Sequence, residues 1–283
     1  MELPLNNGTM MPTLGLGVYL VSDGATCESA VETALRSGYR LVDTAVAYGN
    51  ERPVGRGIRA SEVPREDVFL TTKMWPSEYG SEKAPAAIER SLERLGCDHI
   101  DLLLLHQPVG DVLAAWSAME AAVAKGTVRS LGVSNFTIPD LERLLAVVRI
   151  RPVVDQIELH PYWQQRELIR FLTTNDIVPE AWYPIGHGSK ELLGEPVITQ
   201  IAQRHGKTAV QVILRWHVQS RHVAIPKSTN PAHIRENIDV YDIELAADEM
   251  TAIASLDKNR PMFRMPRWLK SAILPHVSSR QLP

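Results

Sequence analysis

The chain has 283 residues, 45% hydrophobic and 22% charged, which is enough for a large buried core and gives no sign of disorder. Its net charge is -3 with no block of like charges, so neither nucleic acid nor a membrane surface is an expected partner. The N-terminus lacks a basic region followed by an apolar core, which predicts a cytoplasmic protein. The two cysteines lie in helical patterns and are expected as free thiols, too few for a cysteine metal site.

The chain is expected to begin with a hairpin. Asn6-Asn7-Gly8, between two short extended segments, predicts this turn, and the hairpin would act as a lid or plug before the main fold. A first strand is predicted at residues 14–18. It contains a G-x-G pattern, but Leu20 stands where a dinucleotide fingerprint needs glycine or alanine, so a Rossmann fold is not predicted there.

Short apolar runs then alternate with helical patterns. Further strands are predicted at residues 40–42, 68–72, 100–105, 128–134, 153–157, 177–182 and 223–225. Helices are predicted between them around residues 27–35, 88–95, 113–123, 141–148, 166–173, 196–205 and 208–219. Eight strands separated by helices predict a single (β/α)8 TIM barrel domain over residues 1–283. Residues 259–283 break this period and predict a tail across the barrel mouth.

Polar side chains follow most of the predicted strands. In a parallel barrel the C-terminal ends of the strands meet at one mouth, so these side chains are predicted neighbours. They are Asp43, Tyr48, Lys73, His106, Ser134, Asn135, Gln156, Trp182, Lys227 and Ser228. Each has an ordinary structural explanation when it is taken alone. Their convergence on one mouth is what indicates a functional site.

An acid, a phenol, an amine and an imidazole together suggest carbonyl reduction. A free phenol has a pKa of about 10, so it needs a nearby cation to exchange a proton near neutrality. Lys73 could supply that cation, with Asp43 holding the amine charged. Neutral His106 could donate a hydrogen bond to the substrate oxygen.

The hydride for such a reaction must come from a cofactor, since no side chain supplies one. Amide and hydroxyl groups of Ser134, Asn135 and Gln156 could fix a nicotinamide carboxamide, and Trp182 could stack on the ring. Lys227 and Ser228 suit a phosphate. No H-E-x-x-H motif or paired-histidine spacing occurs beside these strands, so no metal is predicted.

Three stretches resemble the signatures of the aldo-keto reductase family. They are G-Y-R-L-V-D-T-A with Y-G-N-E from residue 38, V-R-S-L-G-V-S-N-F from residue 128, and I-P-K-S from residue 225 with Glu236-Asn237. The resemblance runs from about Leu5 to Asp257. It is strongest to bacterial 2,5-diketo-gluconate reductase-like and prostaglandin F synthase-like members.

This resemblance implies an NADP(H)-dependent reductase of small-molecule aldehydes and ketones, often monomeric, with Tyr48 as general acid aided by Asp43, Lys73 and His106. The backbone from Tyr183 to Gly188 would cover the pyrophosphate. The cofactor-binding residues that it implies are Gly17, Ser134, Asn135, Gln156, Trp182, Tyr183, Ile185, Gly186, Lys227, Ser228, His233, Glu236 and Asn237.

Two departures from the family pattern affect specificity. His233 stands where the third signature expects arginine, and arginine grips a phosphate with a permanent, bidentate charge, so we expect NADPH to bind but NADH to be tolerated. Gln107 stands where relatives often carry tryptophan, and the loop that follows it is short. The predicted substrate pocket is therefore lined by Tyr19, Trp75, Gln107, Phe263 and Trp268.

Two other functions fit parts of the pattern. A Schiff-base aldolase could use Lys73, but this chemistry needs a neutral lysine, and Asp43 would raise the pKa of the amine. A nicotinamide-binding regulatory subunit would bind the cofactor without appreciable turnover.

Overall fold

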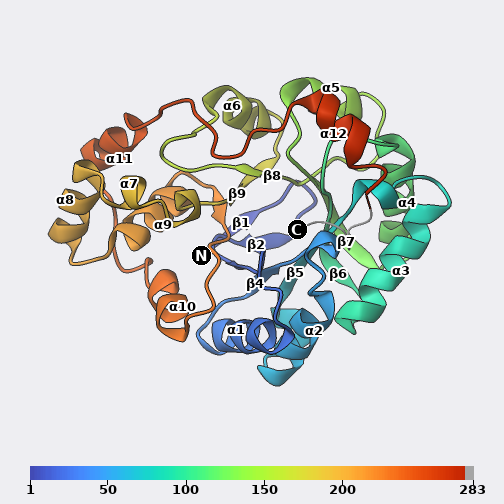
Figure 1. Cartoon of the computed structure of the whole chain (residues 1–283), viewed down its shortest axis with the longest axis horizontal. Coiled ribbons are helices and arrows are strands. Elements are labelled where there is room, and N and C mark those ends of the chain that lie inside the picture. The colour runs from blue at the N-terminus through green and yellow to red at the C-terminus, as the bar shows by residue number, and fades with distance from the viewer. Residues whose placement is uncertain (278–283) are drawn as a thin grey trace.

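Eight parallel strands form the centre of the computed structural model, which describes residues 1–277 (Figure 1). The strands are β3 (Leu16–Gly17), β4 (Leu41–Asp43), β5 (Phe69–Met74), β6 (Ile100–Leu105), β7 (Val128–Ser134), β8 (Val154–Glu158), β9 (Val178–Trp182) and β10 (Val223–Ala224). Their order in the sheet follows the sequence. Parallel bridges from Leu14 to Ala224 and from Gly17 to Lys227 join the first strand to the last, so the sheet closes and the predicted barrel is confirmed.

Helices surround this barrel. They are α1 (Gly24–Arg36), α2 (Glu51–Ala60), α3 (Lys83–Leu95), α4 (Val112–Ala124), α5 (Ile138–Leu145), α6 (Arg166–Thr174), α7 (Lys190–Leu193), α8 (Pro196–His205), α9 (Ala209–Gln219), α10 (Pro231–Ile238), α11 (Ala247–Ala254) and α12 (Arg267–Ile273). Several of them pack an apolar face on the outside of the strands, as Leu35 of α1 does with Val42 of β4 in the main hydrophobic core, whereas α12 has no buried residue. Within residues 1–277, no helix is long and apolar enough to cross a membrane.

Helix α2 is among the helices absent from the sequence-based prediction, and it contains a proline and two glycines. The structure shows why glycine is needed there. A Cβ on Gly55 would lie 1.9 Å from the carbonyl oxygen of Leu95, and one on Gly57 would lie 2.6 Å from that of Glu28. These glycines let α2 lie close to α3 and α1, and tertiary packing therefore outweighs their low helix propensity.

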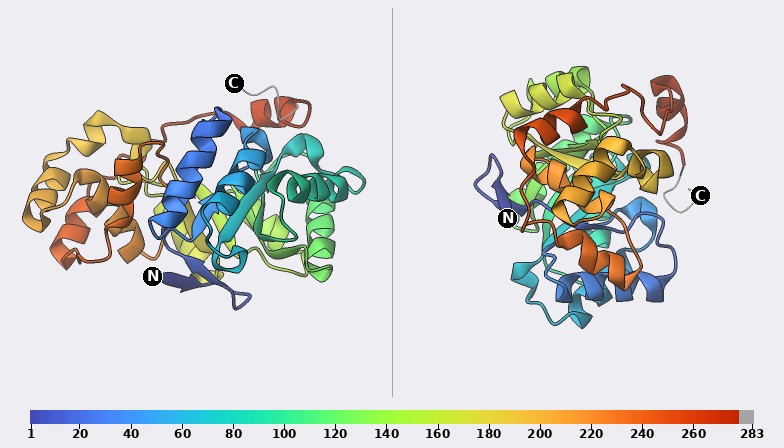
Figure 2. Two further views of the ribbon diagram at one scale, coloured as in Figure 1. Left: turned by 90° about the horizontal axis from the view of Figure 1, so that it is seen from below. Right: turned by 90° about the vertical axis from the view of Figure 1, so that its left-hand side faces the viewer.

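The N-terminal hairpin closes the end of the barrel opposite the mouth. Strands β1 (Glu2–Pro4) and β2 (Met10–Pro12) pair antiparallel, and Leu3 and Met11 pack against barrel-interior residues such as Phe69. The Asn6 amide donates to the carbonyl oxygens of Pro152 at 2.9 Å and Asp176 at 3.0 Å, just before β8 and β9 begin. The predicted hairpin is thus a plug, and Figure 2 shows it at one end of the barrel with the C-terminal tail at the other.

The C-terminal tail lies along the mouth. The backbone N–H groups of Met262 and Phe263 donate to the carboxylate of Glu158, at 2.5 Å and 3.3 Å. Further along, the indole N–H of Trp75 donates to the carbonyl oxygen of Val277 at 3.0 Å. The tail therefore reaches from the end of β8 to the end of β5. The predicted tail extends to residue 283, and its last six residues, 278–283, lie outside the described residues.

Candidate active site

Tyr48, Lys73 and Asp43 meet at the C-terminal ends of β4 and β5. The ammonium of Lys73 contacts Asp43 Oδ1 at 2.5 Å, the carbonyl oxygen of Thr44 at 2.9 Å and the hydroxyl of Tyr48 at 3.2 Å. The imidazole of His106 lies beside the phenol, with ring centroids 5.8 Å apart in an edge-on arrangement. The four side chains therefore occupy one site, as the strand-end argument predicts.

Local chain geometry brings Tyr48 to Lys73. The short 3-10 helix η1 (Val46–Tyr48) follows β4, and Gly49 then takes a left-handed φ of 66°. Asn50 fixes this turn because it accepts from the Thr44 hydroxyl at 2.7 Å and its amide donates to the carbonyl oxygen of Val18 at 2.9 Å. The loop after β4 is thereby held against the loop after β3, and the phenol ring points over the mouth.

The Lys73 ammonium is fully buried, and Asp43 is its single counter-ion in the part of the chain that the structure describes. Its side chain is 0% exposed and that of Asp43 2% exposed. Burial lowers the pKa of Lys73, but the charge of Asp43 and the neighbouring Tyr48 outweigh burial and raise it above the ordinary value. The amine therefore stays charged. A Schiff-base nucleophile needs a neutral amine, so this geometry does not favour the aldolase alternative.

The proton of Tyr48 is retained at neutral pH. Burial raises the pKa of Tyr48 to about 12, although Lys73 pulls the pKa down. The sequence predicts only that Lys73 lowers the pKa of Tyr48, whereas in the structure the rise caused by burial is the larger effect. Tyr48 is thus a neutral phenol with a hydrogen to donate, held next to a fixed positive charge that would stabilise its anion.

His106 is kept neutral by its surroundings. Burial, together with the positive charges of Lys73 and Lys270, lowers the pKa of His106 well below its ordinary value. Its Nδ1 atom is buried and has no partner among residues 1–277. Nε2 is therefore the nitrogen available to a group in the mouth. A neutral imidazole can offer that group a hydrogen bond without competing with Tyr48 for the proton.

Ser134, Asn135 and Trp182 form a polar rim on the opposite side of the mouth. Asn135 takes a left-handed φ of 63°, which asparagine tolerates better than most residues. Its amide donates to Ser134 Oγ at 2.9 Å, and its Oδ1 accepts from the Trp182 indole N–H at 3.0 Å. The rim links three successive strands, β7, β8 and β9, because Ser134 Oγ also donates to the carbonyl oxygen of Gln156 at 2.9 Å.

Gln156 connects this rim to the ion pair and to a further acid, Glu180. Its amide nitrogen donates to Asp43 Oδ2 at 2.8 Å and to Glu180 Oε2 at 2.9 Å. Glu180 lies on β9 and is 0% exposed. The sequence analysis does not predict it. The available signal was a charged residue within a predicted buried strand, where a carboxyl is costly unless it has partners.

The residues predicted for the phosphate and adenine end lie on β10 and α10, away from the ion pair. Lys227 is exposed and has no ion-pair partner within residues 1–277, while Ser228 is buried and accepts from the backbone N–H of Asn230 at 3.1 Å. His233 is exposed on α10, Glu236 is half-buried and Asn237 is buried. A free ammonium beside a helix N-terminus forms a surface suited to an anion.

The loop after β9 has an unusual backbone. Four of its residues, Tyr183, Gly186, His187 and Gly188, have positive φ angles of 53°, 58°, 54° and 72°. The carbonyl oxygen of Pro184 in this loop contacts Nε2 of the buried His217 at 3.0 Å. Such backbone conformations persist only where the surrounding structure holds them, and they concentrate at binding sites.

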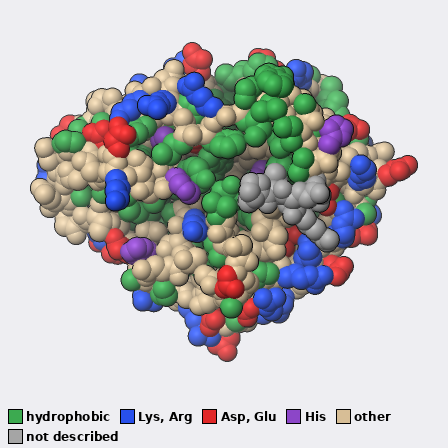
Figure 3. Space-filling model, viewed as in Figure 1, with side chains coloured by type: hydrophobic (Ala, Val, Ile, Leu, Met, Phe, Trp, Pro, Cys, Tyr) green, Lys and Arg blue, Asp and Glu red, His purple; other side chains and the backbone are tan. Residues whose placement is uncertain are grey.

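The predicted substrate-pocket residues fall into two groups. Trp75 and Tyr19 lie next to the four central side chains: the Trp75 ring is 5.0 Å from that of His106, and the Tyr19 ring 5.0 Å from that of Tyr48. Gln107 Oε1 accepts from Lys270 of the tail at 3.1 Å. Phe263 and Trp268 are 56% and 71% exposed. Hydrophobic side chains gather over α5 and α12 on this face (Figure 3).

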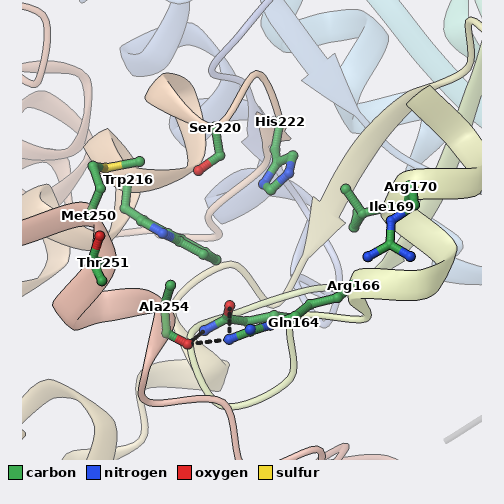
Figure 4. Close-up of a pocket in the computed structure, with 10 residues that line it drawn as sticks. All are labelled: Gln164, Arg166, Ile169, Arg170, Trp216, Ser220, His222, Met250, Thr251 and Ala254. Atoms are coloured by element: carbon green, nitrogen blue, oxygen red, sulfur yellow. Dashed lines mark hydrogen bonds between the residues drawn. The ribbon is translucent and has the colours of Figure 1, made fainter. Parts of the chain in front are cut away.

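A separate groove lies outside the barrel, between α6, α9 and α11 (Figure 4). It has a volume of about 480 Å³ and is lined by Gln164, Arg166, Ile169, Arg170, Trp216, Ser220, His222, Met250, Thr251 and Ala254. None of the predicted site residues is among them. The residues predicted for the site therefore all lie away from this groove.

A closed parallel barrel with a phenol, an ammonium, a carboxylate and an imidazole at its mouth defines a carbonyl reductase of the barrel type. The family model described as "Aldo/keto reductase family" matches residues 5–258. The chain belongs to this family, and it is an oxidoreductase that reduces carbonyl groups with a nicotinamide cofactor. The resemblance to this family noted in the sequence is confirmed by this match.

Individual relatives cover nearly the whole chain. It is 48% identical to a morphine 6-dehydrogenase from Pseudomonas putida over 89% of this chain and 90% of the relative. It is 44% identical to a glyoxal reductase from Bacillus subtilis over 90% of this chain and 92% of the relative. Among solved structures, an aldo/keto reductase from Brucella melitensis superposes with a TM-score of 0.87 at 43% identity, over 91% of this chain and 99% of that one. An aldo-keto reductase from Bombyx mori in complex with NADP superposes with a TM-score of 0.90 at 32% identity, over 95% and 96%.

Proposed function

We propose that this protein reduces small-molecule aldehydes and ketones to alcohols with NADPH, and that Tyr48 is the proton donor. The observation that carries the proposal is the 3.2 Å contact between the Tyr48 hydroxyl and the buried Lys73 ammonium. A phenol next to a fixed cation can release its proton as charge develops on a bound oxygen. In the forward reaction the carbonyl carbon gains a hydride, the oxygen gains the phenol proton, and solvent later returns a proton to Tyr48.

Each of the four central residues has one task in this scheme. Tyr48 donates the proton to the substrate oxygen, and Lys73 stabilises the negative charge left on the phenol. Asp43 keeps the Lys73 amine charged and in place. His106 directs the substrate oxygen toward Tyr48 through Nε2. Trp75 and Tyr19 flank the oxygen site and shield it from water.

The donor groups of the mouth fit a nicotinamide dinucleotide. Ser134, Asn135 and Gln156 would hold the carboxamide, and Trp182 would lie against the ring. The exposed ammonium of Lys227, with Ser228 and the first turn of α10, would hold a phosphate. When bound, the nicotinamide supplies the hydride. The loop from Tyr183 to Gly188 would lie over the pyrophosphate.

The proposed activity is tested with a panel of carbonyl substrates and both reduced cofactors. Because the relatives include a glyoxal reductase and a morphine 6-dehydrogenase, the panel runs from small dicarbonyls to polycyclic ketones. We expect consumption of NADPH, followed at 340 nm as a routine assay wavelength, with at least one aldehyde. Cofactor binding without reduction of any panel member would instead support the regulatory-subunit alternative.

His233 is proposed to weaken the preference for NADPH over NADH. Its exposed side chain on α10 occupies the position where the family signature expects arginine. A permanent, bidentate guanidinium should grip the 2'-phosphate more tightly. We expect H233R to lower the KM for NADPH roughly tenfold, equivalent to about 1.4 kcal/mol.

The KM for NADH is the internal control for H233R, because NADH has no 2'-phosphate and should be unaffected. H233A should leave both constants near those of the wild type. The expected tolerance of NADH would be contradicted if micromolar NADPH saturates the wild-type enzyme but no accessible concentration of NADH does.

A further inference from the structure

We propose that Glu180 is a positioning residue of the cofactor site, and this inference rests on the proposed function. Glu180 accepts the second hydrogen of the Gln156 amide and so turns the Gln156 carbonyl oxygen toward the barrel mouth. The parallel register places the two residues side by side, Gln156 on β8 opposite Glu180 on β9. Glu180 would act on the cofactor through Gln156 and would not touch it.

The Gln156 amide can satisfy its neighbours in only one orientation. Its nitrogen carries two hydrogens, and both have acceptors: Asp43 Oδ2 at 2.8 Å and Glu180 Oε2 at 2.9 Å. A flipped amide would place its oxygen against Oδ2 of the ionised Asp43 carboxylate, which repels it. Oε1 of Gln156 has no donor within residues 1–277, so it can still accept a hydrogen bond, for example from a carboxamide N–H.

Without Glu180, Asp43 alone would hold the amide. One hydrogen bond fixes the position of the nitrogen but allows the side chain to turn about it, whereas two acceptors define the plane of the amide. The same Asp43 also balances Lys73 through its other oxygen, at 2.5 Å. Glu180 therefore adds the constraint that Asp43 cannot supply.

Glu180 can do this without adding charge to the catalytic ion pair. Within residues 1–277 the Lys73 ammonium donates to Asp43, Thr44 and Tyr48, and no cation forms an ion pair with Glu180. Burial and the negative charge of Asp43 raise the pKa of Glu180 to about 8, against smaller opposing effects of Gln156 and Lys73. At neutral pH the carboxyl is protonated, and the charge of Lys73 stays directed at Asp43 and Tyr48.

A purely structural role would predict different behaviour. Glu180 Oε1 is buried and has no partner within residues 1–277, which makes this carboxyl costly for the fold. Replacing it with leucine should then preserve or improve stability and leave cofactor binding unchanged. A positioning role predicts that the same change weakens cofactor binding.

The experiment measures binding of NADPH and NADH to the wild type, E180L, E180Q and D155N by fluorescence titration. Asp155 is a matched control: it is a fully buried acid next to Gln156 on β8, but the alternation of the strand turns it away from the barrel interior. We expect E180L to weaken the binding of NADPH and of NADH by the same factor, five- to tenfold, because both cofactors carry the nicotinamide. E180Q keeps an acceptor, and D155N does not touch the Gln156 amide. Both should bind the cofactors with a Kd within about twofold of the wild-type value, a smaller change than the loss of one hydrogen bond causes.

Thermal unfolding tests the proton on Glu180 without any cofactor. The unfolded carboxyl ionises near 4.5, whereas the folded one keeps its proton up to about 8. Folding of the wild type therefore loses stability as the pH rises between these values, and E180Q escapes this loss. We expect the Tm of E180Q minus that of the wild type to grow from pH 5 to pH 8. A constant difference would overturn the protonated state.

The outcomes separate the two proposals. Wild-type binding together with unchanged binding by E180L would overturn the role of Glu180 and leave the reductase proposal intact. Equal weakening by E180L and D155N would also overturn it, because a general effect of buried acids would explain both. If E180L does not fold, E180Q decides: the proposal requires near-native binding and the pH-dependent Tm difference. A wild-type protein that binds neither nucleotide would overturn the proposed function itself.

Discussion

Replacing Tyr48 with phenylalanine is expected to leave cofactor binding intact and to reduce the rate of carbonyl reduction by a factor of about 10² to 10⁴, the usual contribution of a general acid. The change removes one hydroxyl, which accepts a hydrogen bond from the Lys73 ammonium at 3.2 Å. That ammonium keeps Asp43 and Thr44 as partners, so the fold should survive. Single-turnover reduction of an aldehyde by bound NADPH, together with fluorescence titration of NADPH, would measure both effects.

Tyr19 provides the matched control for this experiment. It is another tyrosine at the mouth, 5.0 Å from the Tyr48 ring, and no hydrogen bond connects it to Lys73 among the described residues. Y19F removes the same atom from the same neighbourhood and should reduce the turnover only slightly. Retention of more than a few per cent of wild-type activity by Y48F would remove Tyr48 as the proton donor.

Much of the barrel could be predicted from the sequence, because buried parallel strands read as short apolar runs. The bounds of β6 and β7 agree with the prediction, and those of the other barrel strands differ by at most two residues. Helix α2 could not be predicted in this way. Its glycines reflect contact with Leu95 and Glu28, which are distant in the sequence, and local propensity gives no information about such contacts.

The central site was predictable for a related reason. Closure of a parallel barrel brings every strand end to the same mouth, so knowing where strands end is enough to group Asp43, Lys73 and His106. The balance of charge within the group was not predictable. Whether burial or Lys73 dominates the pKa of Tyr48 depends on the depth of the pocket, and the contact between Gln156 and Glu180 depends on the register of two strands.

The tail marks the limit of this kind of prediction. Its irregular sequence suggested a position over the mouth but not its attachments. In the structure its attachments include Glu158, Gln107 and Trp75, each at the end of a different strand or in the loop that follows it. These contacts involve backbone groups of the tail as well as side chains, so no sequence pattern predicts them.

Replacing Lys73 with methionine is expected to have the largest effect on both activity and stability. Methionine is close to lysine in length and fits a buried site, so the change mainly removes the charge. The variant leaves the Asp43 carboxylate buried without its counter-ion, and breaking a buried ion pair in this way costs about 3 to 5 kcal/mol of folding free energy. Loss of the cation should also reduce the rate of reduction at least a hundredfold, the scale of one preorganised charge.

The stability loss of K73M should depend on pH in a definite direction. Burial raises the pKa of Asp43, and Lys73 and Gln156 oppose that rise. Without Lys73 the opposition weakens, so folded Asp43 would hold a proton to a higher pH than the unfolded chain does. An acid with a raised folded-state pKa stabilises the fold at low pH and loses that contribution as the pH rises. K73M should therefore be closest to the wild type in urea unfolding at pH 5 and furthest from it at pH 9.

A double variant separates the two roles of Lys73. D43N/K73M removes both charges and leaves a neutral amide in place of the carboxylate, so it should recover most of the lost stability and the pH dependence should disappear. Its activity should stay as low as that of K73M, because the phenol still lacks a cation. Recovery of carbonyl reduction in the double variant would show that Lys73 serves only to balance the charge of Asp43. Covalent trapping of a carbonyl compound on Lys73 of the wild type by borohydride would show that the amine is a nucleophile.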